Sequence, residues 1–423
     1  MKKTIFPCLI ALLVSTGISA QTRSPEIEAL IREDNALAGV NTKPYTFREI
    51  HDTKAPKGYK PFYISHYGRH GSRSDWGIPH YEGLIHTLEQ AKAGGFLTAS
   101  GDSLLQEART VLEITNGMNG RLTQRGVREH QQIAERMYKR YERVFKKGSK
   151  KLTAFSSTSP RCIISMTGFT GKLIEMDPNL KFVWDTGEKF YDYIGTDCTP
   201  ETRAKSEPVL DSVLATHPLR ENYTLDILFS DREKAKELVP DQAVLERQIF
   251  ETAKVTEGFD MENNTFRFLP FEAIWKWYDY YNLELYLRQG NSVRYGMERM
   301  PLTEPLIKDI IARADAAIET GEYAADLRFG HDYTVVSLGG YLGLEGVGDK
   351  LTISEAQKTW CGGINVCFAE NIQMIFYRKS EKDPVLVKFL FNENETLLRG
   401  LQPVSGPYYE WETVKKNIKG YLR

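Results

Sequence analysis

Three short segments rich in β-branched and aromatic residues most constrain the fold, because two of them end directly at clusters of polar residues. They are 61-PFYISHY-67, 151-KLTAFSST-158 and 324-AADLRF-329. Apolar runs of this length, bounded by glycine or proline, are typical of buried β-strands. The first runs into 68-GRH-70 and the third into 330-GHD-332. Open α/β sheets bind ligands at the carboxyl ends of their strands, so these two ends are the first candidates for a functional site.

Segments with helical periodicity alternate with these strands, which predicts an α/β core. Residues 199–300 differ from the rest, because they are polar, aromatic-rich and mainly helical in pattern. We therefore expect a core formed by residues 21–198 and 301–423, with a helical excursion at about 80–145, and a helical cap inserted at 199–300. The predicted helices are 81–97, 102–116, 122–145 with Thr123 as its N-cap, the segment after Pro160, 306–321 capped by Thr303, and 411–422; two further strands are predicted at 370–379 and 385–392.

The N-terminus has the layout of a secretory signal peptide. Lys2 and Lys3 precede an apolar run that begins at Ile5, and small residues follow up to Ala20. The run is shorter than the ~20 apolar residues that a membrane-spanning helix needs. The sequence therefore predicts cleavage of residues 1–20 and an exported protein, periplasmic or secreted, that is not held in the membrane.

The charge balance limits the possible partners. The formal net charge is −1, with 55 Lys and Arg against 56 Asp and Glu. A protein that binds nucleic acid is usually basic as a whole or over one face, so no nucleic-acid partner is expected. Recognition of an anion must come from a local cluster of cations.

Four cysteines lie beyond the predicted signal peptide: Cys162, Cys198, Cys361 and Cys367. In an exported chain, four cysteines allow two disulfides in three connectivities. The segment 361-CGGINVC-367 resembles a hairpin turn, which favours a Cys361–Cys367 bridge. None of the four has zinc-finger spacing.

The first strand end lies within 62-FYISHYGRHGSRSDW-76, which admits a metal site as one interpretation. His66 and His70 are four residues apart, and this spacing binds metals naturally on a helix, where both side chains share a face. Here a strand and two glycines surround the pair, and no acidic residue or cysteine precedes Asp75. We therefore expect no metal, and His66 is expected to be a core histidine.

A second interpretation is an anion-binding loop that carries a nucleophile. Arg69 and Arg73 supply planar, permanently charged groups suited to bidentate phosphate contacts. An imidazole between two guanidinium groups has a depressed pKa, since like charges disfavour its protonation. His70 would stay neutral even in acid, and a neutral imidazole beside a bound phosphate is a nucleophile. On these residues alone, a solvated turn that arises by chance is an equal alternative.

Taken together, the motifs resemble those of the histidine acid phosphatases, the second branch of the histidine phosphatase superfamily. The run 69-RHGSR-73 matches the R-H-G-x-R signature of that family, and 156-SSTSPRCIIS-165 resembles its strand-end segment with a further phosphate-binding arginine. The run 329-FGHDYTVVSLGG-340 resembles its C-terminal His-Asp motif, and 371-NIQMIFYRKS-380 with 387-VKFLFNENET-396 resembles its closing hairpin. The resemblance implies a mainly parallel three-layer α/β core, phosphoglycerate-mutase-like, with a helical cap.

The resemblance also implies roles for single residues. His70 corresponds to the nucleophile that becomes phosphohistidine. Arg69, Arg73 and Arg161 correspond to the phosphate-binding arginines, and His331 to a further histidine of the phosphate pocket. Asp332 corresponds to the general acid that protonates the leaving group. No metal or cofactor is implied, since the arginines supply the positive charge that a metal supplies in other phosphatases.

One departure leaves the subfamily open. The Arg-Cys-x-x-Ser form at Arg161 resembles the multiple inositol polyphosphate phosphatases, which typically carry His-Ala-Glu at the second motif. This chain has His331-Asp332-Tyr333 instead, as in the acid phosphatases and phytases. The alternatives to these roles are a helix N-cap for Asp332, a surface arginine at a helix start for Arg161 and a buried structural histidine for His331.

The sequence therefore predicts a phosphomonoesterase whose substrate is a small phosphate ester, with inositol polyphosphates such as phytate as the leading class. A broad-specificity acid phosphatase is the alternative enzyme, and an inactive phosphoester-binding protein is the alternative of another class. Lys254, Arg288 and Arg294 are candidate contacts for secondary phosphates. The aromatic run 275–287 is either a wall that stacks on the inositol ring or a helix packed within its own cap. Oligomeric state and regiospecificity are not predicted.

Overall fold

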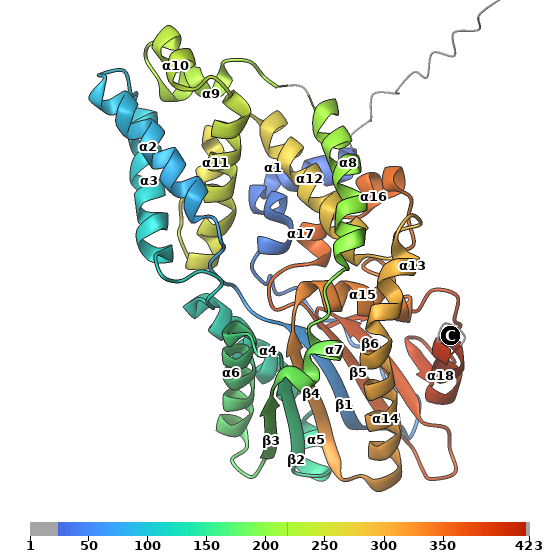
Figure 1. Ribbon diagram of the computed structural model, residues 1–423. Coiled ribbons are helices and arrows are strands. Elements are labelled where there is room, and N and C mark those ends of the chain that lie inside the picture. Colours follow the sequence, from blue (N-terminus) through green and yellow to red (C-terminus); the bar gives the residue numbers. More distant parts are fainter. Residues whose placement is uncertain (1–23, 218, 420–423) are drawn as a thin grey trace, which may run out of the picture.

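The computed structural model describes residues 24–217 and 219–419. The predicted signal peptide lies outside these residues. Figure 1 shows a β-sheet flanked by helices, with a second group of helices beyond the carboxyl ends of the parallel strands, where the predicted site residues lie. No helix among the described residues has the length and apolar character that crossing a membrane requires.

The sheet has eight strands in the order β3-β2-β4-β1-β5-β6-β7, with β8 paired to β6. Pairing among β3, β2, β4 and β1 is parallel, and the strands from β5 onward add antiparallel pairs. The α/β core was therefore predicted correctly, with an antiparallel extension on the β1 side. The strands are β1 (Lys60–Arg69), β2 (Lys151–Ser156), β3 (Lys181–Thr186), β4 (Tyr323–Gly330), β5 (Asn371–Arg378), β6 (Leu386–Phe391), β7 (Asn394–Thr396) and β8 (Tyr408–Glu410).

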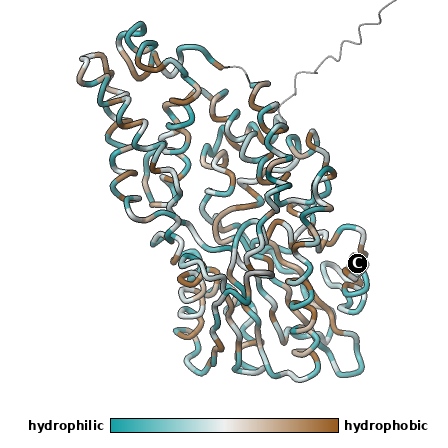
Figure 2. The backbone as a smooth tube through the Cα atoms, viewed as in Figure 1, coloured by the Kyte–Doolittle hydropathy of each residue, from teal (hydrophilic) through white to brown (hydrophobic). Residues whose placement is uncertain are grey.

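Helices cover both faces of the sheet. Successive side chains of a strand point to opposite faces, and in β1 Ile64 packs with the apolar side chains of α4 (Gln124–Arg140) and α6 (Pro160–Met176). Tyr63 and Tyr67 belong to the other apolar cluster, which includes α14 (Glu304–Thr320). Burial on both faces explains why β1 is a nearly continuous apolar run. Figure 2 shows hydrophobic stretches along the strands and hydrophilic ones in the loops at the far end of the sheet.

The core helices follow the predicted segments, but two of them differ in detail. Thr303 stands at the N-cap position of α14 but makes no side-chain capping hydrogen bond, and its hydroxyl donates to Ser337 Oγ at 2.8 Å instead. Thr123 is the N-cap of α4, its hydroxyl accepting a hydrogen bond from Gly126 N at 3.2 Å, as predicted. The helix does not continue to residue 145: the backbone leaves helical geometry at Tyr141, and α5 (Glu142–Lys147) follows. Strand β3 was missed, because it lies at the sheet edge with exposed or partly buried side chains and its apolar run, residues 182–184, is short. Further core helices are α7 (Tyr191–Ile194), α15 (Asp332–Leu342) and α18 (Trp411–Lys419).

The second group of helices combines residues from three parts of the sequence. From residues 199–300 it contains α8 (Pro200–Thr216), α9 (Tyr223–Leu228), α10 (Arg232–Leu238), α11 (Gln242–Thr256), α12 (Phe271–Gln289) and α13 (Gly296–Arg299). The predicted excursion at 80–145 divides: α2 (Ile78–Ala93) and α3 (Ala99–Thr115) pack with α11, whereas α4 packs on α6 (Figure 1). The N-terminal arm, formed by α1 (Pro25–Glu33) and the 3-10 segment Asn35–Thr42, contacts α11, α12 and α17 (Gly362–Asn365). We refer to these elements as the cap.

The aromatic run of α12 is mainly part of the cap interior. Trp275, Trp277 and Tyr278 are buried among apolar neighbours. Of this run, Tyr281, Glu284 and Leu285 line the cavity described below, and Tyr281 is the one aromatic residue among them. This favours the interpretation of a helix packed within its own cap over a continuous stacking wall.

The predicted Cys361–Cys367 disulfide is wrong in this structure, and all four cysteines in the described part of the chain are buried free thiols. The segment between Cys361 and Cys367 is the helical turn α17 rather than a hairpin, with Asn365 N donating to Cys361 O at 2.9 Å. The two thiols have different surroundings: Cys361 lies near the Tyr278 hydroxyl, and Cys367 lies near Glu370 and Arg69.

Candidate active site

The parallel strands bring the predicted motifs together at the carboxyl ends of the strands. Arg69 at the end of β1 is in register with Gly330 at the end of β4, and Ser156 at the end of β2 is in register with Phe329. The residues that follow these ends therefore meet in space, although as many as 260 positions separate them. A cavity of about 500 Å³ lies between these strand ends and the cap. Its walls include Asn41, His70, Arg73, Arg161, His331 and Asp332, together with Trp76, Tyr281, Glu284 and Arg288.

His70 is held in one orientation and in one tautomer. Its backbone is fixed on both sides, because His70 N donates to Gly330 O at 2.9 Å and His70 O accepts from Ala369 N at 3.0 Å. Its Nδ1 lies 2.9 Å from Gly71 O. A carbonyl oxygen only accepts, so Nδ1 carries the hydrogen and Nε2 keeps its lone pair. Burial, followed by the nearby guanidinium groups, holds the pKa of His70 well below its usual value.

Arg69 lies behind the cavity wall and is completely buried. Its Nη1 donates to Val366 O at 3.1 Å, and its guanidinium lies over the Phe368 ring at 4.5 Å. Its Nη2 is 3.2 Å from Asp332 Oδ2, yet neither Nε nor Nη2 makes a hydrogen bond within the described residues. A buried guanidinium with unused donors is suited to an additional oxygen ligand.

Arg73 and Arg161 line the cavity itself. Arg73 Nη1 donates to Ser74 O at 2.9 Å and to Asp75 Oδ1 at 3.0 Å. The Trp76 ring lies 4.6 Å from the Arg73 guanidinium and 5.5 Å from that of Arg161. The buried Nε atoms of both arginines make no hydrogen bond to any residue the structure describes. Together with Arg69, they place positive charge close enough to His70 to lower its pKa.

His331 is also fixed as a neutral tautomer. Arg161 Nη2 lies 3.3 Å from His331 Nδ1, and Ser157 Oγ lies 3.1 Å from Nε2. Since a guanidinium only donates, Nδ1 is the acceptor and Nε2 carries the hydrogen. Burial and the Arg161 charge lower the pKa of His331 to about 3. The ring stacks on Tyr333 at 4.8 Å and lies 5.7 Å from the His70 ring.

Asp332 lies in the first turn of α15, and the N-cap position belongs to His331. Asp332 Oδ1 accepts from Tyr333 N at 3.0 Å, and Oδ2 accepts from Asn41 Nδ2 at 2.7 Å. Burial alone would raise the pKa of Asp332, but the Arg69 charge and the Asn41 hydrogen bond oppose it, and the net shift is downward. The alternative interpretation of Asp332 as a helix N-cap therefore does not describe its contacts.

The loop between β1 and α2 contacts α4 at van der Waals distance. A Cβ atom on Gly71 would lie 2.4 Å from Gly126 O, and one on Gly126 would lie 2.3 Å from Ser72 O. Only glycine at both positions allows this approach. It brings Ser72 against Glu129 of α4, whose carboxylate accepts from Ser72 N at 2.7 Å and from Ser72 Oγ at 2.6 Å.

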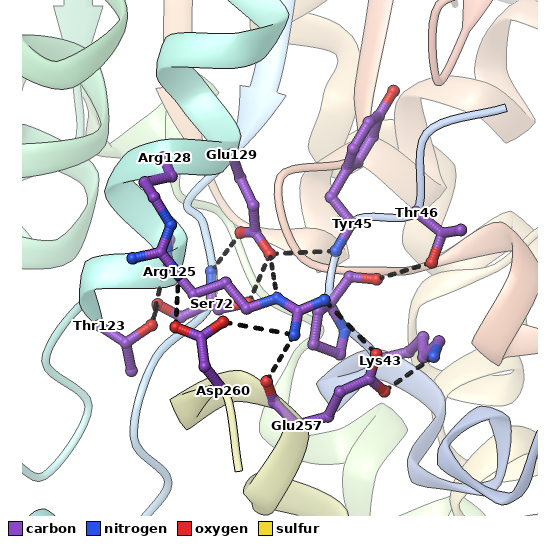
Figure 3. A network of polar contacts seen from close by, with 12 residues as sticks. Lys43, Tyr45, Thr46, Ser72, Thr123, Arg125, Arg128, Glu129, Glu257 and Asp260 are labelled. Carbon is purple, nitrogen blue, oxygen red and sulfur yellow. Dashed lines mark hydrogen bonds and ion pairs between the residues drawn. The ribbon is translucent and has the colours of Figure 1, made fainter. Parts of the chain in front are cut away.

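Glu129 belongs to a network of polar contacts that joins the loop, α4, the N-terminal arm and the cap (Figure 3). Its Oε1 also accepts from Tyr45 N at 3.1 Å. Arg125, one turn earlier, donates to Glu257 O at 2.8 Å, and Glu257 Oε2 pairs with Lys43 Nζ at 2.8 Å. Neither Asn41 nor Glu129 was predicted as a site residue, since neither lies in a recognisable motif.

The three cations that were candidates for secondary phosphates differ in position. Arg288 lines the cavity but pairs with Glu207 and Glu284 of the cap. Lys254 lies behind Arg73, where its Nζ is 3.1 Å from Asp75 Oδ2. Arg294 is exposed beside Tyr295 and does not line the cavity. Arg203, which was not predicted, lines it and pairs with Asp197 at 3.1 Å.

The alternative metal site receives no support from the position of His66. Its ring lies 5.2 Å from the Phe169 ring and 5.4 Å from the Phe329 ring in the sheet interior. Burial lowers the pKa of His66 to about 3. Within the described residues, no three histidine, cysteine or acidic side chains form a group that could hold a metal ion.

Comparisons with known proteins agree with this geometry. No curated protein matches the chain. Among solved structures, the Bifidobacterium longum multiple inositol polyphosphate phosphatase in complex with phosphate is 17% identical, with a TM-score of 0.74, over 91% of this chain and 98% of that one. The same protein in complex with inositol hexasulfate is 18% identical, with a TM-score of 0.70, over 90% and 97% of the two chains.

The phytase from D. castellii is 13% identical, with a TM-score of 0.68, over 97% of this chain and 90% of that one. At these identities the likeness shows a shared fold. The family model of the histidine phosphatase superfamily (branch 2) matches residues 68–392, from the loop that carries His70 to the end of the closing hairpin. The predicted family is therefore confirmed, and the chain belongs to branch 2 of the histidine phosphatase superfamily.

Proposed function

We propose that the protein is an exported phosphomonoesterase that works through a phosphohistidine intermediate. The observation that carries this proposal is the unprotonated Nε2 of His70, held in a cavity between Arg69, Arg73 and Arg161. A phosphoryl group in this cavity would be held by guanidinium groups with unused donors. Positioned cations stabilise the charge that spreads over the equatorial oxygens during phosphoryl transfer. Export rests on the N-terminal sequence alone.

The proposed reaction has two displacements. In the first, the His70 Nε2 lone pair forms a bond to phosphorus as the bond from phosphorus to the ester oxygen breaks, and Asp332 gives its proton to that oxygen. In the second, water attacks phosphorus, the Asp332 carboxylate takes a proton from it, and the phosphorus–nitrogen bond breaks. Inorganic phosphate leaves, and His70 and Asp332 return to their starting states. An acid that serves an alkoxide leaving group contributes roughly 10²–10⁴-fold.

The substrate class is proposed to be inositol polyphosphates, such as phytate. The structural neighbours support this, because one is a multiple inositol polyphosphate phosphatase and another is a phytase. Arg203 and Arg288 in the cavity wall could receive phosphates beyond the one that reacts. A broad-specificity acid phosphatase remains the second candidate, because both arginines already pair with cap carboxylates. Turnover of phytate is to be compared with that of sugar and aryl phosphates, and equal rates on small esters would favour the second candidate.

Trapping of the intermediate tests the mechanism. Wild-type protein mixed with a ³²P-labelled ester and quenched in alkali should carry label that acid releases, as expected of a phosphoramidate. His70→Ala should carry none. An inactive phosphoester-binding protein would bind the ester and carry no covalent label in either form.

A further inference from the structure

The side chain of Asn41 contacts the carboxylate that the proposed function uses as its proton donor. Asn41 Nδ2 donates to Asp332 Oδ2 at 2.7 Å, across 291 positions of sequence. Asn41 also lines the cavity, so its amide lies at the reaction site rather than behind it. We infer that Asn41 is a positioning residue that orients Asp332 and selects which of its oxygens carries the proton. This inference rests on the proposed role of Asp332.

The backbone before Asn41 is held in an unfavourable conformation. Val40 has φ 52° and ψ −109°, in a region that β-branched residues rarely adopt. Such a conformation persists only where the surrounding structure enforces it. Here Val40 is buried against α17: a Cβ atom on Gly362 would lie 2.5 Å from Val40 Cγ1, and one on Gly363 would lie 2.3 Å from Leu37 O. The packed arm therefore fixes the direction from which the Asn41 amide reaches Asp332.

The hydrogen bonds of Asp332 assign its two oxygens to different tasks. The Asn41 amide group only donates, so Oδ2 is its acceptor. Arg69 Nη2 lies on the same side, 3.2 Å from Oδ2. Two donor groups therefore face Oδ2, whereas Oδ1 faces one among the described residues, the Tyr333 amide, and this asymmetry favours Oδ1 as the oxygen that carries the proton of the acid form. Loss of the Asn41 contact would let the carboxyl rotate and exchange the two oxygens.

The other ionisable groups around Asp332 are unchanged in an Asn41 variant. They come from five segments and are Tyr67 and Arg69 of β1, Arg73 of the loop between β1 and α2, Arg161 and Cys162 of α6, His331 and Tyr333 on either side of Asp332, and Glu370 before β5. A hydrogen bond to the ionised form lowers the pKa of an acid, so its removal raises that pKa. A changed pH profile in the variant therefore reports the lost Asn41 contact.

The test is the leaving-group dependence of Asn41→Ala. We expect kcat/KM for glycerol phosphate, whose alkoxide needs a proton, to fall on the order of tenfold, and that for 4-nitrophenyl phosphate to fall less than about twofold. The alkaline limb of the pH profile should move up by about half a pH unit or more. Asn41→Asp, which keeps the volume but cannot donate when ionised, should move the limb further. Asn41→Asp also provides the test if Asn41→Ala does not fold.

Two controls separate this role from a structural one. Asn35→Ala changes another residue of the same arm, whose Nδ2 donates to Ile31 O, and should leave both the substrate ratio and the pH limb as in the wild type. In an Asp332→Asn background, Asn41→Ala should change the substrate ratio no further. Equal losses on both substrates with an unmoved pH limb would overturn the role of Asn41. If Asp332→Asn itself affected both substrates equally, the proposed function of Asp332 would fail instead.

Discussion

Both carboxylate oxygens of Glu129 accept hydrogen bonds from Ser72, Oε2 from the backbone amide at 2.7 Å and Oε1 from the hydroxyl at 2.6 Å. Ser72 is two residues from His70, so this contact fixes the loop that carries the proposed nucleophile. Glu129 is buried and accepts from Tyr45 N as well. All three of these groups donate their hydrogen bonds, so only a side chain with an acceptor at both positions, such as a carboxylate, satisfies them.

Glu129→Gln should therefore misplace the loop. The glutamine presents one acceptor and one NH₂ group, and the NH₂ group would face a donor. We expect kcat to fall by about 10²-fold, because small misplacement of catalytic groups is costly, and the free energy of unfolding to fall by about 1–3 kcal/mol. Ser72→Ala is the matched variant: it keeps the backbone bond and should retain activity within about tenfold. Equal activity of Glu129→Gln and the wild type would contradict the role of this carboxylate.

Asp75 joins the loop between β1 and α2 to the cap, since Oδ1 lies 3.0 Å from Arg73 Nη1 and Oδ2 lies 3.1 Å from Lys254 Nζ. Burial would raise its pKa, but Lys254 and Arg73 reverse that effect and hold the pKa far below its usual value. Asp75→Asn should therefore lower the unfolding free energy by about 3 kcal/mol, as for the loss of one partner from a buried ion pair. Asp102→Asn, in the exposed pair with Lys92, should change it by less than about 1 kcal/mol. Similar values for the two variants in chemical denaturation would contradict this account.

Arg288 tests whether the cap recognises secondary phosphates. Arg288→Ala should raise KM for phytate by about tenfold, through loss of one charged contact, and leave KM for 4-nitrophenyl phosphate unchanged. Arg294→Ala, an exposed residue of the same region outside the cavity, should change neither. If Arg288→Ala affects both substrates alike, the broad-specificity alternative is favoured.

Buried neutral histidines should make the fold less stable in acid. Burial lowers the pKa of His66 and His130 to about 3, and burial with the Arg161 charge does the same for His331. Below about pH 6.5 the unfolded chain binds protons at these residues that the folded protein does not, so stability falls as pH falls towards 3. Each histidine contributes a slope of about 1.4 kcal/mol per pH unit in this window. His130→Leu should reduce the slope of unfolding free energy against pH by that amount between roughly pH 6 and 4, the window that these pKa values set. An unchanged slope would show that His130 has the same pKa in the folded and unfolded states.

Enzymatic activity, unlike the stability of the fold, should increase as the pH falls. Asp332 acts while protonated, and the net shift of its pKa is downward. His70 acts while neutral, and its pKa is also held low. Activity is therefore expected to be greatest in acid and to fall as pH rises through the pKa of Asp332 in the complex. A maximum of kcat well above neutrality would argue against Asp332 as the donor.

The parts that the sequence predicts correctly are those that local signals determine. Strand β1 is an apolar run that ends at Arg69-His70, and α4 begins at a threonine cap, so both follow from neighbouring residues. Asn41 and Glu129 reach the site through tertiary packing, and neither carries a local signal. The turn at Cys361 was predicted incorrectly for a related reason: two glycines suit a hairpin, yet packing of Gly363 on Leu37 O and of Gly362 on Val40 holds a helical turn.

The stereochemistry at phosphorus tests the central claim most directly, because it requires no change to the protein. The phosphoryl group of a phosphate ester made chiral with the three oxygen isotopes is transferred to an alcohol acceptor, and the configuration of the product ester is determined. Each in-line displacement inverts phosphorus. A phosphohistidine at His70 requires two displacements and predicts net retention, whereas net inversion would mean direct attack by the acceptor and would contradict the account.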